Sequence, residues 1–227
     1  MKSQQQGFTL VEIAIVLVII GLLLGGVMKG QELINSAKVK NLSNDFRNFS
    51  SAVYAYQDRF RALPGDDRAA DTHVAGGTNA GTPATCGAGG ASACIGNARI
   101  NGAWNSTTQT DETYLFWQHV RLAGLVTGVP TVGNADYIPR NAEGGVIGVT
   151  GDPVLTNPVT PFPANFYVCS QGIQGRFARQ IDTMMDDGNT TTGSVRVIAD
   201  GAASQVDATP NLTPLNDATL YTVCMAF

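Results

Sequence analysis

The sequence predicts an α+β protein in which one long N-terminal helix is followed by a small sheet. Two observations support this prediction. An apolar stretch at residues 8–28 is followed by an amphipathic stretch at residues 39–60, and no proline occurs before Pro64. The last third of the chain instead contains short segments rich in β-branched and aromatic residues, a composition typical of strands.

The apolar stretch from Phe8 to Met28 is long enough to cross a membrane. It contains 21 residues, and none from Ile13 to Met28 is charged. About 20 helical residues span a hydrocarbon core of about 30 Å. Because Lys2 precedes the stretch, the positive-inside rule places the first residues in the cytoplasm and the rest outside. A cleaved secretory signal is the competing interpretation, but it would not need a helical pattern that continues past the apolar segment.

The amphipathic stretch places large apolar side chains on one helical face, because they recur at alternating steps of three and four residues. These residues are Val39, Leu42, Phe46, Phe49, Val53, Tyr56 and Phe60. The motif LPGDD, which starts at Leu63, is a stop signal. We therefore expect one helix from Phe8 to about Arg59 whose second half packs on a globular domain.

The segment from about residue 69 to 105 is rich in Gly, Ala, Ser and Thr, which predicts a long surface loop. Residues 111–125 have helical spacing and end at Gly124. Further on, the strand candidates are residues 165–169, 194–198 and 219–225. Between the first two of these, a helical face is formed by Ile173, Phe177, Ile181 and Met184.

All four cysteines lie on the exported side of the apolar stretch, where disulfides persist. Cys169 and Cys224 each lie in a strand candidate, which favours pairing them. Their bridge would close a 55-residue loop and stabilise the fold by roughly 4 kcal/mol. Cys86 and Cys94 lie eight residues apart. Four cysteines allow three connectivities, so both pairings rest on proximity.

Composition and motifs exclude several classes of function. The net charge is −4, only 14% of residues are charged, and no basic cluster indicates a nucleic-acid partner. No P-loop, G-x-S-x-G or Cys-His nucleophile pattern is present. His73 and His119 match no zinc spacing, and we interpret both as surface residues. We therefore expect no catalytic residue and no cofactor.

Two acidic clusters offer hard oxygen ligands of the kind that calcium prefers. Asp66 and Asp67 form the first, and Asp186, Asp187 and Asn189 form the second. Neither cluster has EF-hand spacing, and Asp-Asp-Gly is first of all a turn sequence. Asp186 and Asp187 are kept as calcium candidates, with a turn as the simpler interpretation.

The stretch GFTLVEIAIVLVIIGLLLGG follows a short polar leader. It combines a Gly-Phe junction at Gly7 and Phe8, a carboxylate at Glu12, and an apolar run of membrane-spanning length that leads into the predicted long helix. This combination resembles the N-terminus of type IV prepilins and of type II secretion pseudopilins. The similarity implies a pilin fold with a leader at 1–7, a transmembrane and assembly half-helix at 8–29, an amphipathic half at 30–60 and a head at 61–227.

The resemblance also implies how the chain is processed. A prepilin peptidase would cut between Gly7 and Phe8 on the cytoplasmic side of the inner membrane and methylate the new amine of Phe8. An assembly platform in the inner membrane would then build the subunit, with its head first in the periplasm, into a filament of pilin subunits outside the cell.

Glu12 is a carboxylate inside the apolar run, where a charge costs roughly 2.5 to 3.5 kcal/mol on insertion scales. The resemblance suggests the ammonium group of Phe8 on a neighbouring subunit as its partner, and the amine of its own Phe8 is the alternative. The midpoint proline of many pilins is absent, and Gly21, Gly25 and Gly26 occur there instead. They could allow local melting, or close helix packing through G-x-x-x-G, which we favour.

These features together predict a structural subunit of a type IV pilus or pilus-like filament. Two alternatives within the class are a type II secretion pseudopilin, which could bind calcium at Asp186 or Asp187, and an adhesive minor pilin that binds a ligand through the 69–105 loop. A membrane-anchored periplasmic enzyme is the alternative from a different class.

Overall fold

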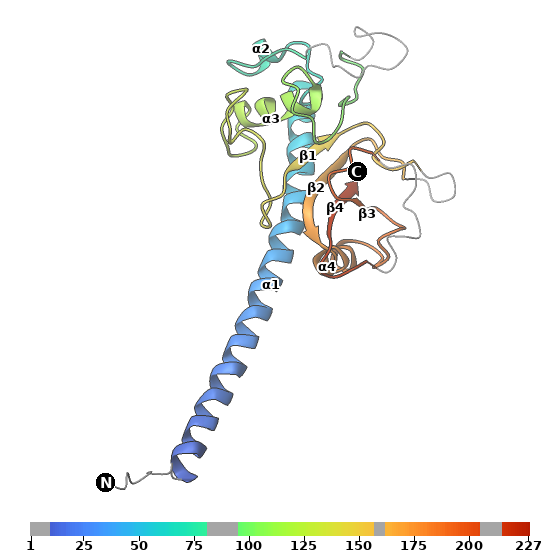
Figure 1. The fold of residues 1–227 in the computed structure, drawn as a ribbon. Coiled ribbons are helices and arrows are strands. Elements are labelled where there is room, and N and C mark those ends of the chain that lie inside the picture. The colour runs from blue at the N-terminus through green and yellow to red at the C-terminus, as the bar shows by residue number, and fades with distance from the viewer. Residues whose placement is uncertain (1–9, 81–94, 157–161, 205–214) are drawn as a thin grey trace. The chain divides into compact units, whose positions relative to one another are not determined.

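The computed structural model describes residues 10–80, 95–156, 162–204 and 215–227. The chain divides into two compact units, residues 1–38 and 39–227. Helix α1 (Leu10–Phe60) belongs to the first unit up to Lys38 and to the second unit beyond it (Figure 1). The second unit therefore contains the amphipathic part of α1 together with all the other elements, and we call it the head.

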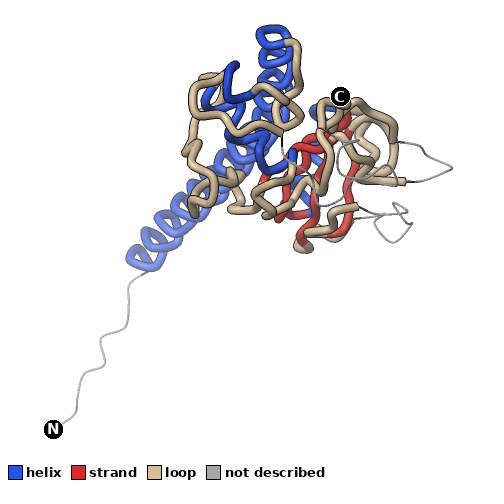
Figure 2. The backbone as a smooth tube through the Cα atoms, turned by 90° about the horizontal axis from the view of Figure 1, so that it is seen from above, coloured by secondary structure: helices blue, strands red, loops and turns tan. Residues whose placement is uncertain are grey.

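The head is built on one antiparallel sheet of four strands in the order β1-β2-β4-β3. The strands are β1 (Ile147–Thr150), β2 (Tyr167–Gln174), β3 (Val195–Ala199) and β4 (Leu220–Ala226). Three helices accompany them: α2 (Ala70–His73), α3 (Glu112–Leu122) and α4 (Gly175–Met185). In Figure 2 the strands lie together beside the second half of α1. The predicted α+β class is confirmed.

The amphipathic part of α1 packs into the main core of the head. Six of the seven side chains in the predicted stripe are buried, from Val39 to Tyr56, and Phe60 is partly buried against Tyr56 and His73. Phe49 meets Trp117 of α3 edge to face, with ring centroids 5.0 Å apart. The same core includes α4 and one face of the sheet. The stripe thus attaches α1 to the head by apolar burial, as its spacing predicted.

The other face of the sheet is also buried, beneath a second apolar cluster. Its members are Trp104, Val154, Leu155, Phe162, Tyr167, Cys169, Ile198 and Cys224. Alternation along the strands separates the two clusters, because Val168 faces the first and both of its neighbours in β2 face the second. The side chains on both faces of the sheet are therefore part of the apolar core of the head.

Helix α1 ends where the stop signal predicted. The last helical residue is Phe60, and Arg61 follows in the left-handed region with φ 56°. Gly65 then turns with φ 94°, and a Cβ at this position would overlap the carbonyl oxygen of Glu112. Only glycine allows the chain to pass so close to the start of α3.

Three predictions about the head need correction. Ile173 lies in β2 rather than in α4, and Met184 is 43% exposed, so the buried face of α4 consists of Phe177, Ala178, Ile181 and Asp182. The strand β1 was not predicted. The described ends of the 69–105 segment only partly fit a surface loop: residues 75–76, 78–79 and 96–99 are exposed, whereas Ile100 and Trp104 are 0% and 2% exposed and Ala70 begins helix α2.

Two leucines of α1 test which part of the helix is packed against the head. Leu42 is 0% exposed, whereas Leu33 is 63% exposed. We expect Leu42→Ala to lower the free energy of unfolding by about 2–5 kcal/mol through lost burial and a residual cavity. Leu33→Ala should cost less than about 1 kcal/mol. Denaturant unfolding of the full chain in detergent, followed by tryptophan fluorescence, measures both. Equal losses would contradict this packing.

Candidate functional site

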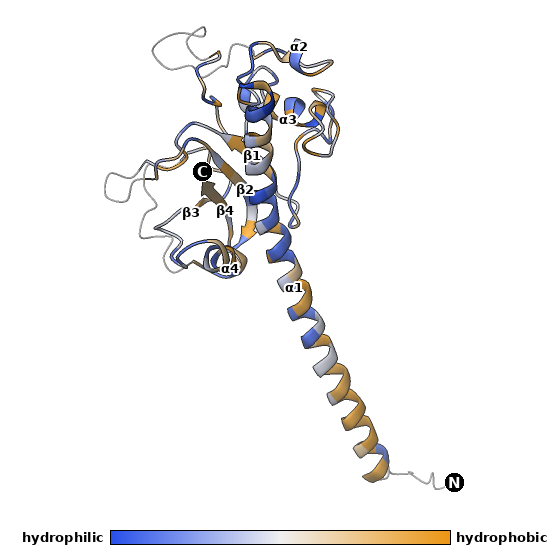
Figure 3. Cartoon of the chain, turned by 180° about the vertical axis from the view of Figure 1, so that it is seen from behind, coloured by the Kyte–Doolittle hydropathy of each residue, from blue (hydrophilic) through white to orange (hydrophobic). Residues whose placement is uncertain are grey.

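The first half of α1 exposes a continuous apolar surface in the single chain. Sixteen large apolar side chains between Leu10 and Ile34 are 46–90% exposed. By length and composition this helix could cross a membrane. Figure 3 shows the hydrophobic colour concentrated in this part of α1. Since the described residues do not cover it, this surface is suited to an apolar environment such as lipid or further helices.

Glu12 lies in the first turn of α1 and is exposed. It is the one charged residue from Leu10 to Met28. The predicted cleavage position, Gly7 and Phe8, lies outside the described residues. A Cβ added at Gly21, Gly25 or Gly26 would meet no other atom within 4 Å, so these positions leave open space on the helix surface. This surface allows another helix to approach closely.

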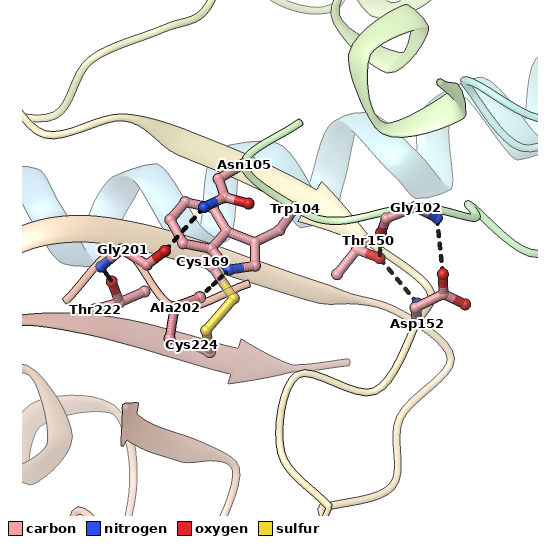
Figure 4. Close-up of a disulfide and its surroundings, with 10 residues drawn as sticks. All are labelled: Gly102, Trp104, Asn105, Thr150, Asp152, Cys169, Gly201, Ala202, Thr222 and Cys224. Atoms are coloured by element: carbon pink, nitrogen blue, oxygen red, sulfur yellow. Dashed lines mark hydrogen bonds between the residues drawn. A yellow bond between two sulfur atoms is a disulfide. The ribbon is translucent and has the colours of Figure 1, made fainter. Parts of the chain in front are cut away.

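Cys169 and Cys224 form a disulfide between β2 and β4, where they lie directly opposite each other with Cα atoms 4.1 Å apart (Figure 4). Trp104 packs beside it in the second cluster, and its indole N–H donates to the carbonyl of Ala202 at 2.8 Å. The bridge joins the two central strands of the sheet. The predicted partners Cys86 and Cys94 lie outside the described residues.

The first acidic cluster of the sequence, Asp66 and Asp67, is buried and engaged by the protein itself. Asp66 accepts hydrogen bonds from the backbone N–H groups of Gly96 and Ala98. Asp67 accepts from the Tyr56 hydroxyl at 2.7 Å and pairs with His73, also at 2.7 Å. Burial acts to raise the pKa of Asp67, but these hydrogen bonds outweigh it and lower the pKa. We therefore interpret this cluster as a structural element that holds the chain after α1.

His119 is buried, so its assignment as a surface residue was wrong. It lies in α3, whose residues from Glu112 to Arg121 are all buried, and its Nδ1 accepts the N–H of Gly65 at 2.9 Å. Its Nε2–H donates to the carbonyl oxygen of Thr78 at 2.7 Å. Burial lowers the pKa of His119 and favours this neutral form. The imidazole thus supplies hydrogen-bond partners to the backbone at Gly65 and at Thr78, in two separate loop segments. The position of His119 in the sequence did not indicate this role.

Glu112 is a fully buried carboxyl group near two other acids. Its Oε2 accepts the N–H of Asn101 at 2.7 Å, whereas Oε1 has no hydrogen-bond partner among the described residues. Burial is the main cause that raises the pKa of Glu112 to about 8, and the charges of Asp66 and Asp152 add to it. The group is therefore protonated at neutral pH.

The second acidic cluster contains three carboxylates rather than the predicted two. Oxygen atoms of Asp182, Asp186 and Asp187 lie within 4.8 Å of one another. Asp182 was missed because it lies in the helical segment before the turn. The signal was nevertheless in the sequence, since residues four apart on a helix share a face. Burial, and then repulsion from Asp187 and Asp186, raises the pKa of Asp182 to about 7.

Comparison with known proteins identifies the N-terminal segment. Residues 2–28 match the family model for the prokaryotic N-terminal methylation motif. This is the class III, type IV pilin-like signal, which indicates a pilin- or pseudopilin-like precursor and suggests a structural protein. No curated protein and no solved structure matches the chain. The long apolar helix and the antiparallel sheet form an α+β, pilin-like architecture that agrees with this signal.

The protonated state of Glu112 predicts a pH dependence of stability. Between about pH 4.5 and pH 8 the folded chain keeps this proton and the unfolded chain releases it. The free energy of unfolding therefore falls as the pH rises, by about 1 kcal/mol per pH unit from this group. Glu112→Gln, which mimics the protonated carboxyl, should gain stability relative to wild type from pH 5 to pH 8.

Urea titrations of the full chain at several pH values measure this difference. Glu32→Gln is the matched control, because Glu32 is exposed and its removal should leave the pH profile unchanged. A constant difference between wild type and Glu112→Gln across the pH range would show that Glu112 is ionised in the folded protein.

Proposed function

We propose that this protein is a structural subunit of a type IV pilus or pilus-like filament. In this proposal it is cut between Gly7 and Phe8, methylated on Phe8, and assembled through the first half of α1. The observation that carries the proposal is the methylation motif at residues 2–28 on a helix whose first half has apolar side chains that the described residues do not cover.

The energetics of the first half of α1 support assembly. Burying one large apolar side chain is worth about 1.5–3 kcal/mol, so the sixteen exposed ones represent tens of kcal/mol. Lipid supplies the cover for the inner-membrane precursor. In a filament outside the cell, helices of other copies supply it. The head already has its own core, so assembly does not require the head to refold.

Glu12 is proposed to set the axial register between subunits. A carboxylate among apolar side chains is stable only when a partner offsets its desolvation. Removal of the leader creates a positively charged amine on Phe8, four residues before Glu12 in the sequence. An apolar surface alone does not fix the axial position of one helix relative to its neighbour in the filament. An ion pair between subunits would fix this axial offset.

The identity of the mature N-terminus tests the processing step. We expect mass spectrometry of the sheared cell-surface fraction to find a chain that begins at N-methylated Phe8. A type II secretion pseudopilin would carry the same N-terminus but remain in the cell envelope fraction. Finding intact Met1, or a cut beyond Met28, would contradict the proposal.

Substitution of Glu12 tests the register. Breaking a buried ion pair costs about 3–5 kcal/mol, so Glu12→Ala should lower the amount of sheared filament by at least about tenfold. Glu32→Ala is the control, because Glu32 pairs with Lys29 at 2.6 Å on an exposed part of the same helix. It should assemble normally. Mass spectrometry of the membrane fraction shows whether Glu12→Ala is still cut, and normal filament amounts in this variant would refute the register role.

A further inference from the structure

The connection between α4 and β3, residues 186–194, contains an acceptor sequence for N-linked glycosylation (Figure 1). Such a sequence is Asn-X-Ser/Thr, in which X is any residue except proline. Here it consists of Asn189, Thr190 and Thr191. The filament function makes no use of this motif. Because Asn-X-Ser/Thr is short and also occurs by chance, the structure around it decides whether an enzyme can reach it.

Four other Asn-X-Ser/Thr sequences occur in the chain, and two of them lie inside helix α1, starting at Asn41 and Asn48. Their hydroxyl groups are not accessible. Ser43 is 1% exposed and Ser50 is 7% exposed, and each donates to a backbone carbonyl in the same helix. An enzyme would have to unwind a packed helix to bind either sequence. These two asparagines are therefore not acceptors in the folded head.

The third of these sequences starts at Asn105, which is half-buried. Its Nδ2, the atom that a sugar would have to join, donates to the carbonyl of Gly201 at 3.0 Å. The fourth starts at Asn211 and lies outside the described residues. Among the sequences that the structure describes, the one at Asn189 is the remaining candidate.

Asn189 is exposed, and its amide is held in a defined orientation. Its Oδ1 accepts the hydroxyl of Thr191 at 2.8 Å and the N–H of the same residue at 3.2 Å. The amide nitrogen is on the other side of the same carbon, and it donates to no atom among the described residues. The Nδ2 of Asn189 is thus available to a reagent from solvent, in contrast to that of Asn105.

The turn that carries Asn189 is stabilised mainly within the connection itself. Asp187 accepts the N–H of Asn189 at 2.8 Å and the hydroxyl of Thr192 at 2.6 Å. Thr190 is 6% exposed, but it occupies the X position, whose side chain the acceptor sequence does not specify. Its burial therefore leaves Asn189 and Thr191, the two residues that define the sequence, outside the core.

We propose that Asn189 is glycosylated on Nδ2 after the head is exported. The donor is a polyprenyl-diphosphate-linked oligosaccharide, and the catalyst is a membrane-bound oligosaccharyltransferase. A bond forms between Nδ2 and the anomeric carbon of the first sugar. The bond from this carbon to the diphosphate oxygen breaks, so that polyprenyl diphosphate leaves with the electron pair. The amide nitrogen gives up one proton to a base of the enzyme.

The glycan also constrains how heads are arranged. A bulky, hydrophilic group is not compatible with a closely packed protein interface. The connection between α4 and β3 would therefore face solvent in any filament of this subunit. The inference rests on the export of the head that the proposed function includes, and it does not depend on filament assembly.

Mass spectrometry of the full chain from native cells tests the proposal, on the membrane fraction and on the sheared surface fraction. Trypsin releases residues 180–196 as one peptide and residues 100–121 as another. We expect the first peptide to be heavier by one or more sugar residues, with fragmentation placing them on Asn189. The second peptide contains Asn105 and is the internal control, which should carry no sugar.

Four variants identify the acceptor. Asn189→Gln should abolish the added mass, and so should Thr191→Val, which keeps the size of the side chain but removes its hydroxyl. Thr191→Ser should retain the glycan, because serine also satisfies the acceptor sequence. Asn105→Gln is the matched control and should leave the mass of the 180–196 peptide unchanged.

Three results would overturn the proposal. They are an unmodified 180–196 peptide in the wild-type chain, a glycan that persists in Asn189→Gln, which would place it on a hydroxyl group, and a glycan that persists in Thr191→Val. The same spectra report the N-terminal peptide. An unmodified Asn189 on a chain that begins at methylated Phe8 therefore contradicts this inference alone, whereas a glycosylated chain with intact Met1 contradicts only the processing.

Discussion

The structure depends on one constraint: a single helix presents two apolar surfaces, and the described part of the chain covers only one of them. The stripe of α1 from Val39 to Tyr56 is buried in the core of the head. The surface from Leu10 to Ile34 remains exposed. Lipid and the helices of other copies are both apolar, so this surface can pass from one to the other at little cost. A subunit that moves from a membrane into a filament needs this property.

The structure of the head is compatible with the proposed transfer, because the head can remain folded throughout. Its sheet is covered on both faces, and the Cys169–Cys224 bridge joins the two central strands. Buried polar groups secure the chain between α1 and α3. His119 holds two backbone segments, and Asp67 accepts from Tyr56 on α1. None of these contacts involves the first half of α1, so the cover of that surface can change without loss of the head's core.

Sequence periodicity predicted the elements whose pattern is local. The stripe of α1, the helix α3 and three strands follow from residue spacing, and the Gly-Phe junction with its carboxylate indicated the signal. Contacts between distant segments were not predictable in the same way. Strand β1 has four residues and contains Gly148, so its sequence is too short to show the alternation of apolar and polar residues typical of a strand. Trp104 lies in a Gly- and Ala-rich segment but covers the disulfide. His119 is buried because α3 is covered on all sides, and Asp182 is buried because its face of α4 meets the core. Composition contains neither piece of information.

The most direct test of the central claim is a cryo-electron microscopy map of sheared filaments that resolves side chains. The account predicts that residues 10–28 of each copy are surrounded by the same segment of other copies. It also predicts a Glu12 carboxylate within about 3 Å of the Phe8 amine of a neighbouring subunit. A filament in which these residues face solvent, or in which each Glu12 contacts only the amine of its own chain, would contradict it.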